Sequence, residues 1–214
     1  MERSALWYLD YVAHDIHRTV VATTDDEGLP VTAAIDMMMA DEGGLYFLTA
    51  RGKGFYRRLI ARPFLALTGM KGDDTMTSVA VSIRGRVREV GPEFLPALFE
   101  RNPYMANIYP TAQSRQALTV FNLYEGTGEW FDLSTKPITR ASFSFGGATA
   151  TAEGYAIDRD LCTGCGTCLP VCPQQCITLH GGIAAIEQAH CLHCGRCAEV
   201  CPTGAAAMRA DRPA

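Results

Sequence analysis

The chain has 214 residues, of which 48% are hydrophobic, and its length suits one large or two modest globular domains. Its formal net charge is −4, and on either side of Gly146 it divides into 15 basic and 17 acidic residues, then 4 and 6, so neither part has the basic excess of a nucleic-acid-binding protein. There is no apolar run of membrane-spanning length, and residues 1–24 do not follow the signal-peptide pattern, so we expect a soluble, cytoplasmic protein that does not bind a membrane.

The first part of the chain alternates mostly between strand-like segments and turns. Leu6, Leu9 and Ile16 follow a helical period, and strand periodicity begins at Thr19. The predicted strands are 19–23, 29–38, 45–49, 64–68 and 77–90, followed by a hairpin of 118–123 and 129–133 around the turn 125–128. Short helices are predicted over 55–61 and from Pro92. These elements predict a small β-barrel with a few helices.

The turn after the third predicted strand has the composition of an anion site. Gly52 and Gly54 expose backbone N–H groups, a helix begins at Phe55, and Arg51 and Lys53 add two positive charges. A solvated basic turn explains the same residues equally well. The arginines of the long strand 77–90 form a second candidate face for an anion: Arg84, Arg86 and Arg88.

Three segments carry a resemblance to a known family. They are the run from Thr23 to Val31, the run from Leu45 to Lys53, and the residues from Phe55 through Pro63. Over roughly residues 5–133 the chain resembles the split barrels of the pyridoxamine 5'-phosphate oxidase type. The resemblance implies a homodimer formed through the barrel, with FMN held in the interface.

The same resemblance assigns residues to the flavin. Thr49, Arg51 and Lys53 would bind its phosphate, although many members carry a lysine where this chain has Phe55. Asp36, Met37 and Met38 match positions that line the isoalloxazine, and the methionines could equally fill the core. Related barrels hold deazaflavin or haem, which remain alternative cofactors.

Several other residues of the first part favour structural roles. His14 and His17 lie at helical spacing, but without a third ligand nearby they indicate an exposed helix face better than a metal site. Tyr104 and Tyr109 would cap a flavin or simply pack. The Gly126-x-Gly128 pair is typical of a hairpin turn and lacks the third glycine of a nucleotide loop. No catalytic triad is evident.

A change of composition marks two domains. Residues 1–161 contain no cysteine, whereas all nine cysteines follow. Near the end of the cysteine-free part, a stretch with Pro137, Gly146 and Gly147 and many Ala and Thr residues is typical of a connector. We therefore predict a split-barrel domain over 1–136, a connector over 137–153 and a cysteine-rich domain over 154–214.

Eight of the nine cysteines form one motif written twice, C-x-x-C-x-x-C-x-x-x-C-P, at an offset of 29 residues. A zinc site closes with four ligands and does not need the third cysteine and the proline of each run, and disulfides would need an oxidising compartment. The repeat favours iron–sulfur clusters and two similar halves, whose strands are predicted at 155–157, 177–179, 183–186 and 205–208 with a hairpin turn at Gly181-Gly182.

The doubled motif resembles the bacterial ferredoxins with two 4Fe-4S clusters. In that family the fourth cysteine of each run binds the other cluster. The resemblance therefore implies one set of ligands from Cys162, Cys165, Cys168 and Cys201, and a second set from Cys191, Cys194, Cys197 and Cys172. The ninth cysteine, Cys176, matches Ala205 in the repeat, which favours a small buried residue over a fifth ligand.

Together the two resemblances imply a mainly β protein with some α, a split β-barrel, fused to a small α+β ferredoxin-like two-cluster domain. The function that follows is an FMN-dependent reductase, in which a ferredoxin-type or other low-potential donor feeds two 4Fe-4S clusters and FMN reduces a small organic substrate. The alternatives are an electron-transfer protein with no substrate of its own, or a barrel that binds deazaflavin or haem. No residue can be assigned as catalytic from the sequence.

Overall fold

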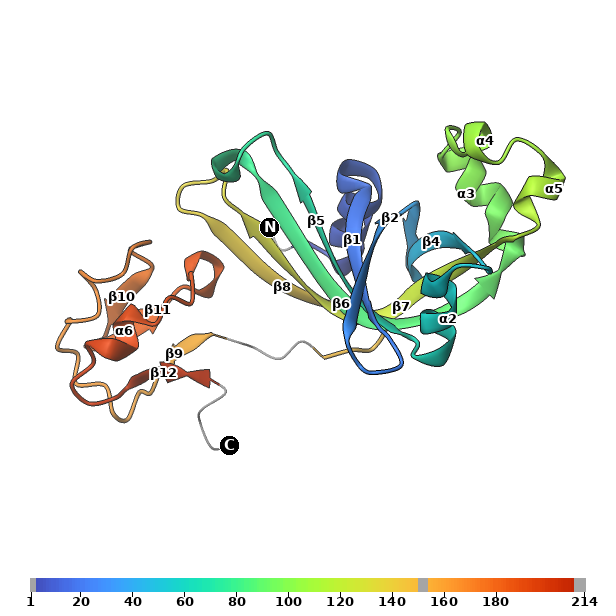
Figure 1. Cartoon of the computed structure of the whole chain (residues 1–214). Helices are drawn as coiled ribbons and strands as arrows, with labels where there is room; N and C mark the ends of the chain where they lie inside the picture. Colours follow the sequence, from blue (N-terminus) through green and yellow to red (C-terminus); the bar gives the residue numbers. More distant parts are fainter. Residues whose placement is uncertain (1–2, 150–153, 210–214) are drawn as a thin grey trace. The chain divides into compact units, whose positions relative to one another are not determined.

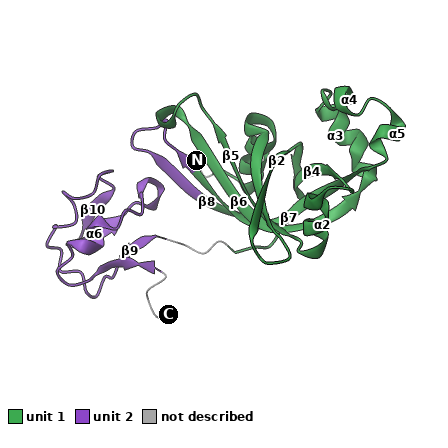
Figure 2. Ribbon diagram, in the orientation of Figure 1, with its two compact units in different colours: residues 1–130, 142–150 green, residues 131–141, 151–214 purple. Residues whose placement is uncertain are grey.

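The structure, a computed structural model, describes residues 3–149 and 154–209. The chain separates into two compact units (Figure 2). The barrel unit comprises Met1–Trp130 and Ser142–Ala150, and the cysteine unit comprises Phe131–Ala141 and Thr151–Ala214. Among the described residues, no helix has the length and apolar character needed to cross a membrane.

The barrel unit is built on one eight-stranded sheet, as the predicted mainly β fold requires (Figure 1). The strand order is β2-β1-β5-β6-β7-β4-β3, and β8 pairs with β7. The strands are β1 (Arg18–Thr24), β2 (Pro30–Asp36), β3 (Met39–Asp41), β4 (Gly44–Ala50), β5 (Phe64–Lys71), β6 (Val79–Gly91), β7 (Leu118–Asp132) and β8 (Thr139–Phe145).

The core of the sheet lies between strands that are distant in sequence. β4 and β7 pair antiparallel with Phe47 opposite Phe121, and these two buried rings stack with centroids 5.8 Å apart. On β6, Val81, Ile83 and Val87 are buried while the alternate residues are exposed, as the strand periodicity predicts. Burial of such cross-strand pairs stabilises the sheet and sets its register.

Helices open the barrel unit and separate its strands at three further places. They are α1 (Ala5–Tyr11), the π-helical turn η1 (Val12–Ile16), α2 (Gly54–Ala61), the 3-10 turns η2 (Thr75–Thr77) and η3 (Pro92–Phe94), α3 (Leu95–Arg101), α4 (Met105–Ile108) and α5 (Ala112–Arg115). α1 begins at Ser4, whose Oγ accepts a hydrogen bond from the Trp7 N–H. Between β6 and β7, α3 buries Leu98 and Phe99 against Met38 and its neighbours.

The predicted hairpin around residues 125–128 is wrong, because β7 runs through them as one strand of 15 residues. Glycine is needed at positions 126 and 128 because neighbouring residues pack directly against the backbone of β7 there. A Cβ on Gly126 would lie 2.5 Å from the carbonyl oxygen of Arg84, and one on Gly128 would overlap the ring of Phe143. Glycine inside a strand often marks such a contact.

The stretch predicted as a connector also contains regular structure. Its residues 139–145 form β8, and residues 150–153 lie outside the described part of the chain. Around Ile138, the backbone N–H donates to Gln174 Oε1 at 3.2 Å and the carbonyl accepts from His190 Nδ1 at 2.8 Å. These contacts explain why residues 131–141 are grouped with the cysteine unit.

The cysteine unit consists of two short antiparallel strand pairs, β9 with β12 and β10 with β11. Its elements are β9 (Tyr155–Ile157), β10 (Ile177–His180), β11 (Ile183–Ile186), the 3-10 turn η4 (Gln188–His190), α6 (Arg196–Glu199) and β12 (Ala206–Met208). Gly181 and Gly182 join β10 to β11 with φ of 59° and 81°. Two positive φ values in a two-residue turn are what the predicted tight hairpin requires.

Candidate cofactor sites

Eight cysteines of the cysteine unit line two separate hollows. One is lined by Cys162, Cys165, Cys168 and Cys201. The other is lined by Cys172, Cys191, Cys194 and Cys197, with Cys176 beside them. Each hollow thus combines three cysteines of one run with the fourth of the other run. This is the grouping that the ferredoxin resemblance implies.

The loops around the hollows repeat their backbone conformation at the offset of 29 residues. Left-handed φ values occur at Gly164 and His193, at Gly166 and Gly195, and at Gln175 and Gly204. Glycine adopts this conformation without a steric penalty, whereas His193 and Gln175 must be held in it by their surroundings. The same loop conformation therefore occurs in both runs and positions the cysteine sulfur atoms. Two of its left-handed residues, His193 and Gln175, are not glycine.

Polar groups of the first hollow point at sulfur. The Ala184 N–H donates to Cys162 Sγ at 3.5 Å, and the Thr167 hydroxyl lies 3.3 Å from Cys165 Sγ. The hydrogen bond from Thr167 lowers the pKa of the Cys165 thiol and favours the thiolate that binds iron. In the repeat, Arg196 takes the place of Thr167, so the two hollows present different groups near their sulfur atoms.

The predicted phosphate turn follows β4 and leads into α2. Thr49 is 2% exposed, and its Oγ1 has no hydrogen-bond partner among the described residues. Arg51 and Lys53 are exposed, and Lys53 is the residue that precedes the first turn of α2. A buried hydroxyl without a partner costs free energy, and a ligand oxygen would satisfy it. On this observation the turn fits a phosphate, with Thr49, Arg51 and Lys53 to hold it.

A carboxylate that the sequence analysis did not consider lies beside this turn. Glu89 Oε1 is 3.5 Å from Arg51 Nε and accepts from Thr119 Oγ1 at 2.6 Å, while Glu89 Oε2 accepts from Tyr56 Oη at 3.1 Å. Thr119 lies directly opposite Thr49 in the sheet. Arg51 is therefore partly neutralised, and a bound phosphate would compete with Glu89 for it.

The three residues assigned to the isoalloxazine occupy different surroundings. Met37 and Met38 are 0% and 2% exposed, and Met38 belongs to the apolar cluster under α3. Asp36 ends β2, and its side chain is 35% exposed. Asp36 therefore offers a polar group to solvent, whereas the two methionines are packed inside this chain.

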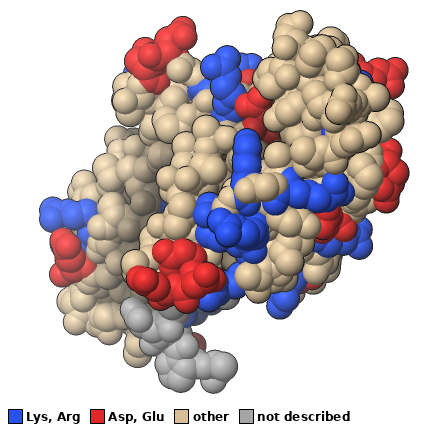
Figure 3. All heavy atoms as spheres, turned by 45° about the vertical axis from the view of Figure 1, so that its right-hand side comes forward, with Lys and Arg blue, Asp and Glu red and all other residues tan. Residues whose placement is uncertain are grey.

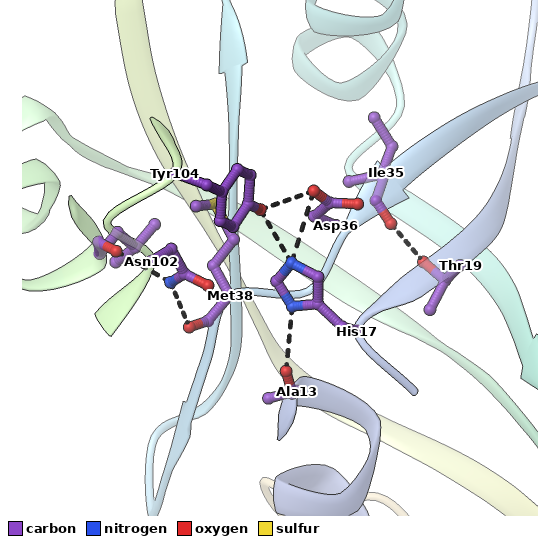
Figure 4. A network of polar contacts seen from close by, with 9 residues as sticks. Ala13, His17, Thr19, Ile35, Asp36, Met38, Asn102 and Tyr104 are labelled. Atoms are coloured by element: carbon purple, nitrogen blue, oxygen red, sulfur yellow. Dashed lines mark hydrogen bonds and ion pairs between the residues drawn. The ribbon is translucent and has the colours of Figure 1, made fainter. Parts of the chain in front are cut away.

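A polar network joins Asp36 to residues far along the chain (Figure 4). Tyr104 Oη donates to Asp36 Oδ2 at 2.6 Å and lies 2.8 Å from His17 Nε2. The expectation that His17 lies on an exposed helix face is wrong, because η1 ends there with φ of 62° and turns the ring towards Tyr104. His14 does lie on an exposed face, 3.2 Å from Asp10.

Asn102, another residue that the sequence analysis missed, supports this network. Its buried side-chain amide donates to the carbonyl oxygens of Met38 at 2.9 Å and Leu98 at 2.8 Å. These bonds connect the end of α3 to the segment after β2. Asn102 lies two residues before Tyr104 and so helps to position it. Met38 lies 64 residues from Asn102, and His17 lies 87 residues from Tyr104, so no local pattern could have revealed these two contacts.

Charge on the surface is mixed. On the face that Figure 3 shows, lysine and arginine side chains lie among aspartate and glutamate side chains. This agrees with the small formal net charge of −4.

Fold and sites define the class of protein: a flavin-binding type of split barrel joined in one chain to a ferredoxin-type cysteine unit. The family model described as pyridoxamine 5'-phosphate oxidase matches residues 11–132, which is 122 of 214 residues, and the 4Fe-4S dicluster domain model matches residues 161–205. The chain belongs to the pyridoxamine 5'-phosphate oxidase family and carries a 4Fe-4S dicluster domain in addition. Both predicted resemblances are thus confirmed.

Solved structures share the barrel fold at low sequence identity. A NimC/NimA family protein of Clostridium acetobutylicum has a TM-score of 0.53 at 18% identity, covering 65% of this chain and 91% of its own. A heme binding protein of Mycobacterium smegmatis has 0.52 at 16%, covering 67% and 59%. A protein related to general stress protein 26, also from C. acetobutylicum, has 0.50 at 15%, covering 65% and 93%. No protein with a curated description matches the chain.

Proposed function

We propose that this protein is an iron–sulfur flavoprotein oxidoreductase, in which two 4Fe-4S clusters and FMN pass electrons to a small organic substrate. The observation that carries the proposal is the presence, in one chain, of two four-cysteine hollows and of a family barrel whose Thr49 hydroxyl is buried without a partner. Neither part alone explains the fusion, because clusters move single electrons and do not select a substrate.

The chain's own residues have distinct roles in this proposal. The eight cysteines hold the clusters as thiolates, four in each hollow. Thr49, Arg51 and Lys53 hold the FMN phosphate by hydrogen bonds and charge. Asp36 offers the ring a polar group, and Met37 and Met38, buried in this chain, support the segment behind it. When bound, FMN supplies the conversion between one-electron and two-electron chemistry.

The proposal extends to the partners of the protein. Split barrels of this family commonly pair, so we expect a homodimer formed through the barrel. A ferredoxin-type or other low-potential donor would supply the electrons, since 4Fe-4S clusters of ferredoxins work at low potential. Cysteines stay reduced and free to bind clusters in the cytoplasm, which is the location we propose.

Metal and cofactor analysis of anaerobically purified protein tests the proposal. We expect about eight iron and about eight sulfide per chain, as two cubanes require. Acid treatment should release FMN, identified by chromatography and mass. About four iron in fully loaded protein would refute two clusters, and release of haem or deazaflavin would refute FMN.

A further inference from the structure

The network of Asp36, Tyr104 and His17 has an unusual construction for a surface feature. Its three members come from three elements: His17 follows η1, Asp36 ends β2, and Tyr104 precedes α4. The His17 carbonyl accepts from the Met37 N–H at 2.8 Å, which places the histidine next to Asp36. Their rings and carboxylate nevertheless remain accessible, with side-chain exposures of 26% for His17 and 35% for Asp36.

The backbone at His17 adopts a conformation that is costly for a non-glycine residue. Its φ of 62° and ψ of −58° directly follow a π-helical turn. Left-handed non-glycine residues and π-turns both persist mainly where function requires them. His14, an exposed histidine of the same segment, does not have a positive φ. The conformation of His17 therefore indicates more than a surface position.

Short polar contacts connect the three side chains into one network. They join Tyr104 Oη to Asp36 Oδ2 at 2.6 Å, Tyr104 Oη to His17 Nε2 at 2.8 Å, and His17 Nε2 to Asp36 Oδ2 at 3.4 Å. His17 Nδ1 lies 3.2 Å from the Ala13 carbonyl, which fixes the plane of the ring. A hydroxyl both donates and accepts, so Tyr104 Oη can give its proton and take one from a neighbour.

The tyrosine itself stays protonated in this setting. Burial, and then the hydrogen bond to Asp36, raises the pKa of Tyr104, while the positive charge of Arg18 opposes the rise. Its hydroxyl can therefore pass a proton on only as it receives another. His17, 2.8 Å from Oη, is placed to relay that second proton from water, and Asp36 orients the hydroxyl.

We propose that Tyr104 donates a proton to the substrate that the barrel reduces, and that His17 and Asp36 position and reload it. This inference rests on the proposed function. The Oη–H bond of Tyr104 breaks as an O–H or N–H bond forms on the substrate, and a proton from water, relayed by His17, restores the O–H bond at Oη. The substrate takes two electrons from the low-potential donor and two protons, one from Tyr104 and one from water. Acceptors whose reduction leaves negative charge on oxygen or nitrogen form the matching substrate class.

Two probe acceptors test this role in the full-length protein with its cofactors. Menadione takes two electrons and two protons, whereas ferricyanide takes one electron and no proton. Tyr104→Phe should slow menadione reduction at least tenfold, since general acids contribute about 10²-fold or more. The rate of ferricyanide reduction should stay within about twofold of the wild-type rate, a change far smaller than the loss of a general acid causes. Tyr109→Phe, a tyrosine five residues further on, is the matched control and should change neither rate.

A second measurement does not depend on turnover. In protein labelled with ¹⁵N-histidine, Tyr104→Phe should shift the ring-nitrogen resonances of His17 and leave those of His14 in place. An unchanged menadione rate in Tyr104→Phe, or an equal loss of both probe rates, would overturn the proton-donor role. A wild-type protein that carries clusters and FMN yet reduces neither probe would instead refute the proposed function, and this role with it.

Discussion

Cys172 and Cys176 lie in the same hollow, and their thiols differ in chemistry although their sulfur atoms are 3.5 Å apart. Burial works against ionisation of Cys172, but hydrogen bonds from Cys176 lower its pKa. Burial and the neighbouring Cys172 raise the pKa of the Cys176 thiol to about 12. The directions of these two shifts agree with the prediction that Cys172 binds iron as a thiolate and that Cys176 fills space.

Single substitutions should separate these roles. We expect Cys172→Ser to lose about half of the iron, because one of two four-iron clusters loses a ligand. Cys176→Ala is the matched control and should keep the full iron content, since Ala205 already occupies the equivalent position of the repeat. Iron analysis and electron paramagnetic resonance of the reduced proteins measure both. Iron loss in Cys176→Ala would make it a ligand after all.

The ion pair between Arg51 and Glu89 leads to two predictions about phosphate binding at the turn. Replacing Arg51 and Lys53 together by alanine should weaken FMN binding roughly tenfold to a hundredfold, which is less than the full value of two charge-assisted hydrogen bonds because solvent screens these exposed groups. Glu89→Gln should tighten binding, since it removes a competing negative charge and keeps the hydrogen-bonding shape. Fluorescence titration of the protein with FMN measures the affinities.

A basic residue that follows α2 and lies beyond the turn provides the control for this titration. Arg62, which follows α2 and lies 3.5 Å from Asp26, can be replaced by alanine without touching the turn. FMN affinity should then be unchanged. If the double alanine variant bound FMN as tightly as the wild type, the turn would not be the phosphate site, and the arginines of β6 would become the next candidates.

At the scale of elements, the continuous strand β7 depends on its glycines. A side chain on Gly128 would overlap Phe143 of β8, whose ring stacks on Tyr8 with centroids 4.5 Å apart. Gly128→Val should therefore destabilise the barrel by about 1–3 kcal/mol, as overpacking does. Urea unfolding followed by tryptophan fluorescence measures it, because Trp7 and Trp130 lie 5.1 Å apart near this contact.

Gly52 supplies the comparison, because a Cβ there would meet nothing within 4 Å and its φ is not left-handed. Gly52→Ala should leave the unfolding midpoint unchanged within about 0.5 kcal/mol, the usual range for surface substitutions. Equal midpoints for both variants would show that the overlap at Gly128 is relieved by movement of Phe143.

Local patterns predicted those elements whose cause is local. The tight turn at Gly181-Gly182 needs two positive φ values, and the alternation of β6 follows from one buried and one exposed face. The cysteine loops are equally local, since spacing alone brings three sulfur atoms of a run around one hollow. Each of these features is decided by residues within a few positions of one another.

Features decided by distant residues were missed or misread. Gly126 and Gly128 have the composition of a turn, but glycine is required there because the backbone of β6 and the ring of Phe143 leave no room for a side chain. The contact of His17 with Tyr104 spans 87 residues, and that of Glu89 with Thr119 spans 30. Side-chain partners brought together by the sheet leave no periodic signal in the sequence.

At the scale of the whole molecule, the proposed function requires electrons to pass between the cofactors of the two units. In that proposal, clusters held in part by Cys165 and Cys194 accept single electrons from a low-potential donor, and a barrel without clusters has no comparable entry point. Exposed cysteines at these positions, one in each hollow, favour electron entry there. Both can be replaced without touching the barrel's own residues.

We expect the double variant Cys165→Ala, Cys194→Ala to keep FMN and lose its reduction by a ferredoxin donor. Dithionite should still reduce the flavin, since a small reductant does not need the clusters. Stopped-flow absorbance of flavin bleaching, with Cys176→Ala as the cysteine control, compares the rates. Because removing the clusters removes the only proposed route from donor to flavin, the donor-driven rate should fall at least a hundredfold, about 2.7 kcal/mol in activation free energy. Equal donor-driven rates in the double variant and the wild type would mean that the clusters are not on the path, and the electron relay would have to be abandoned.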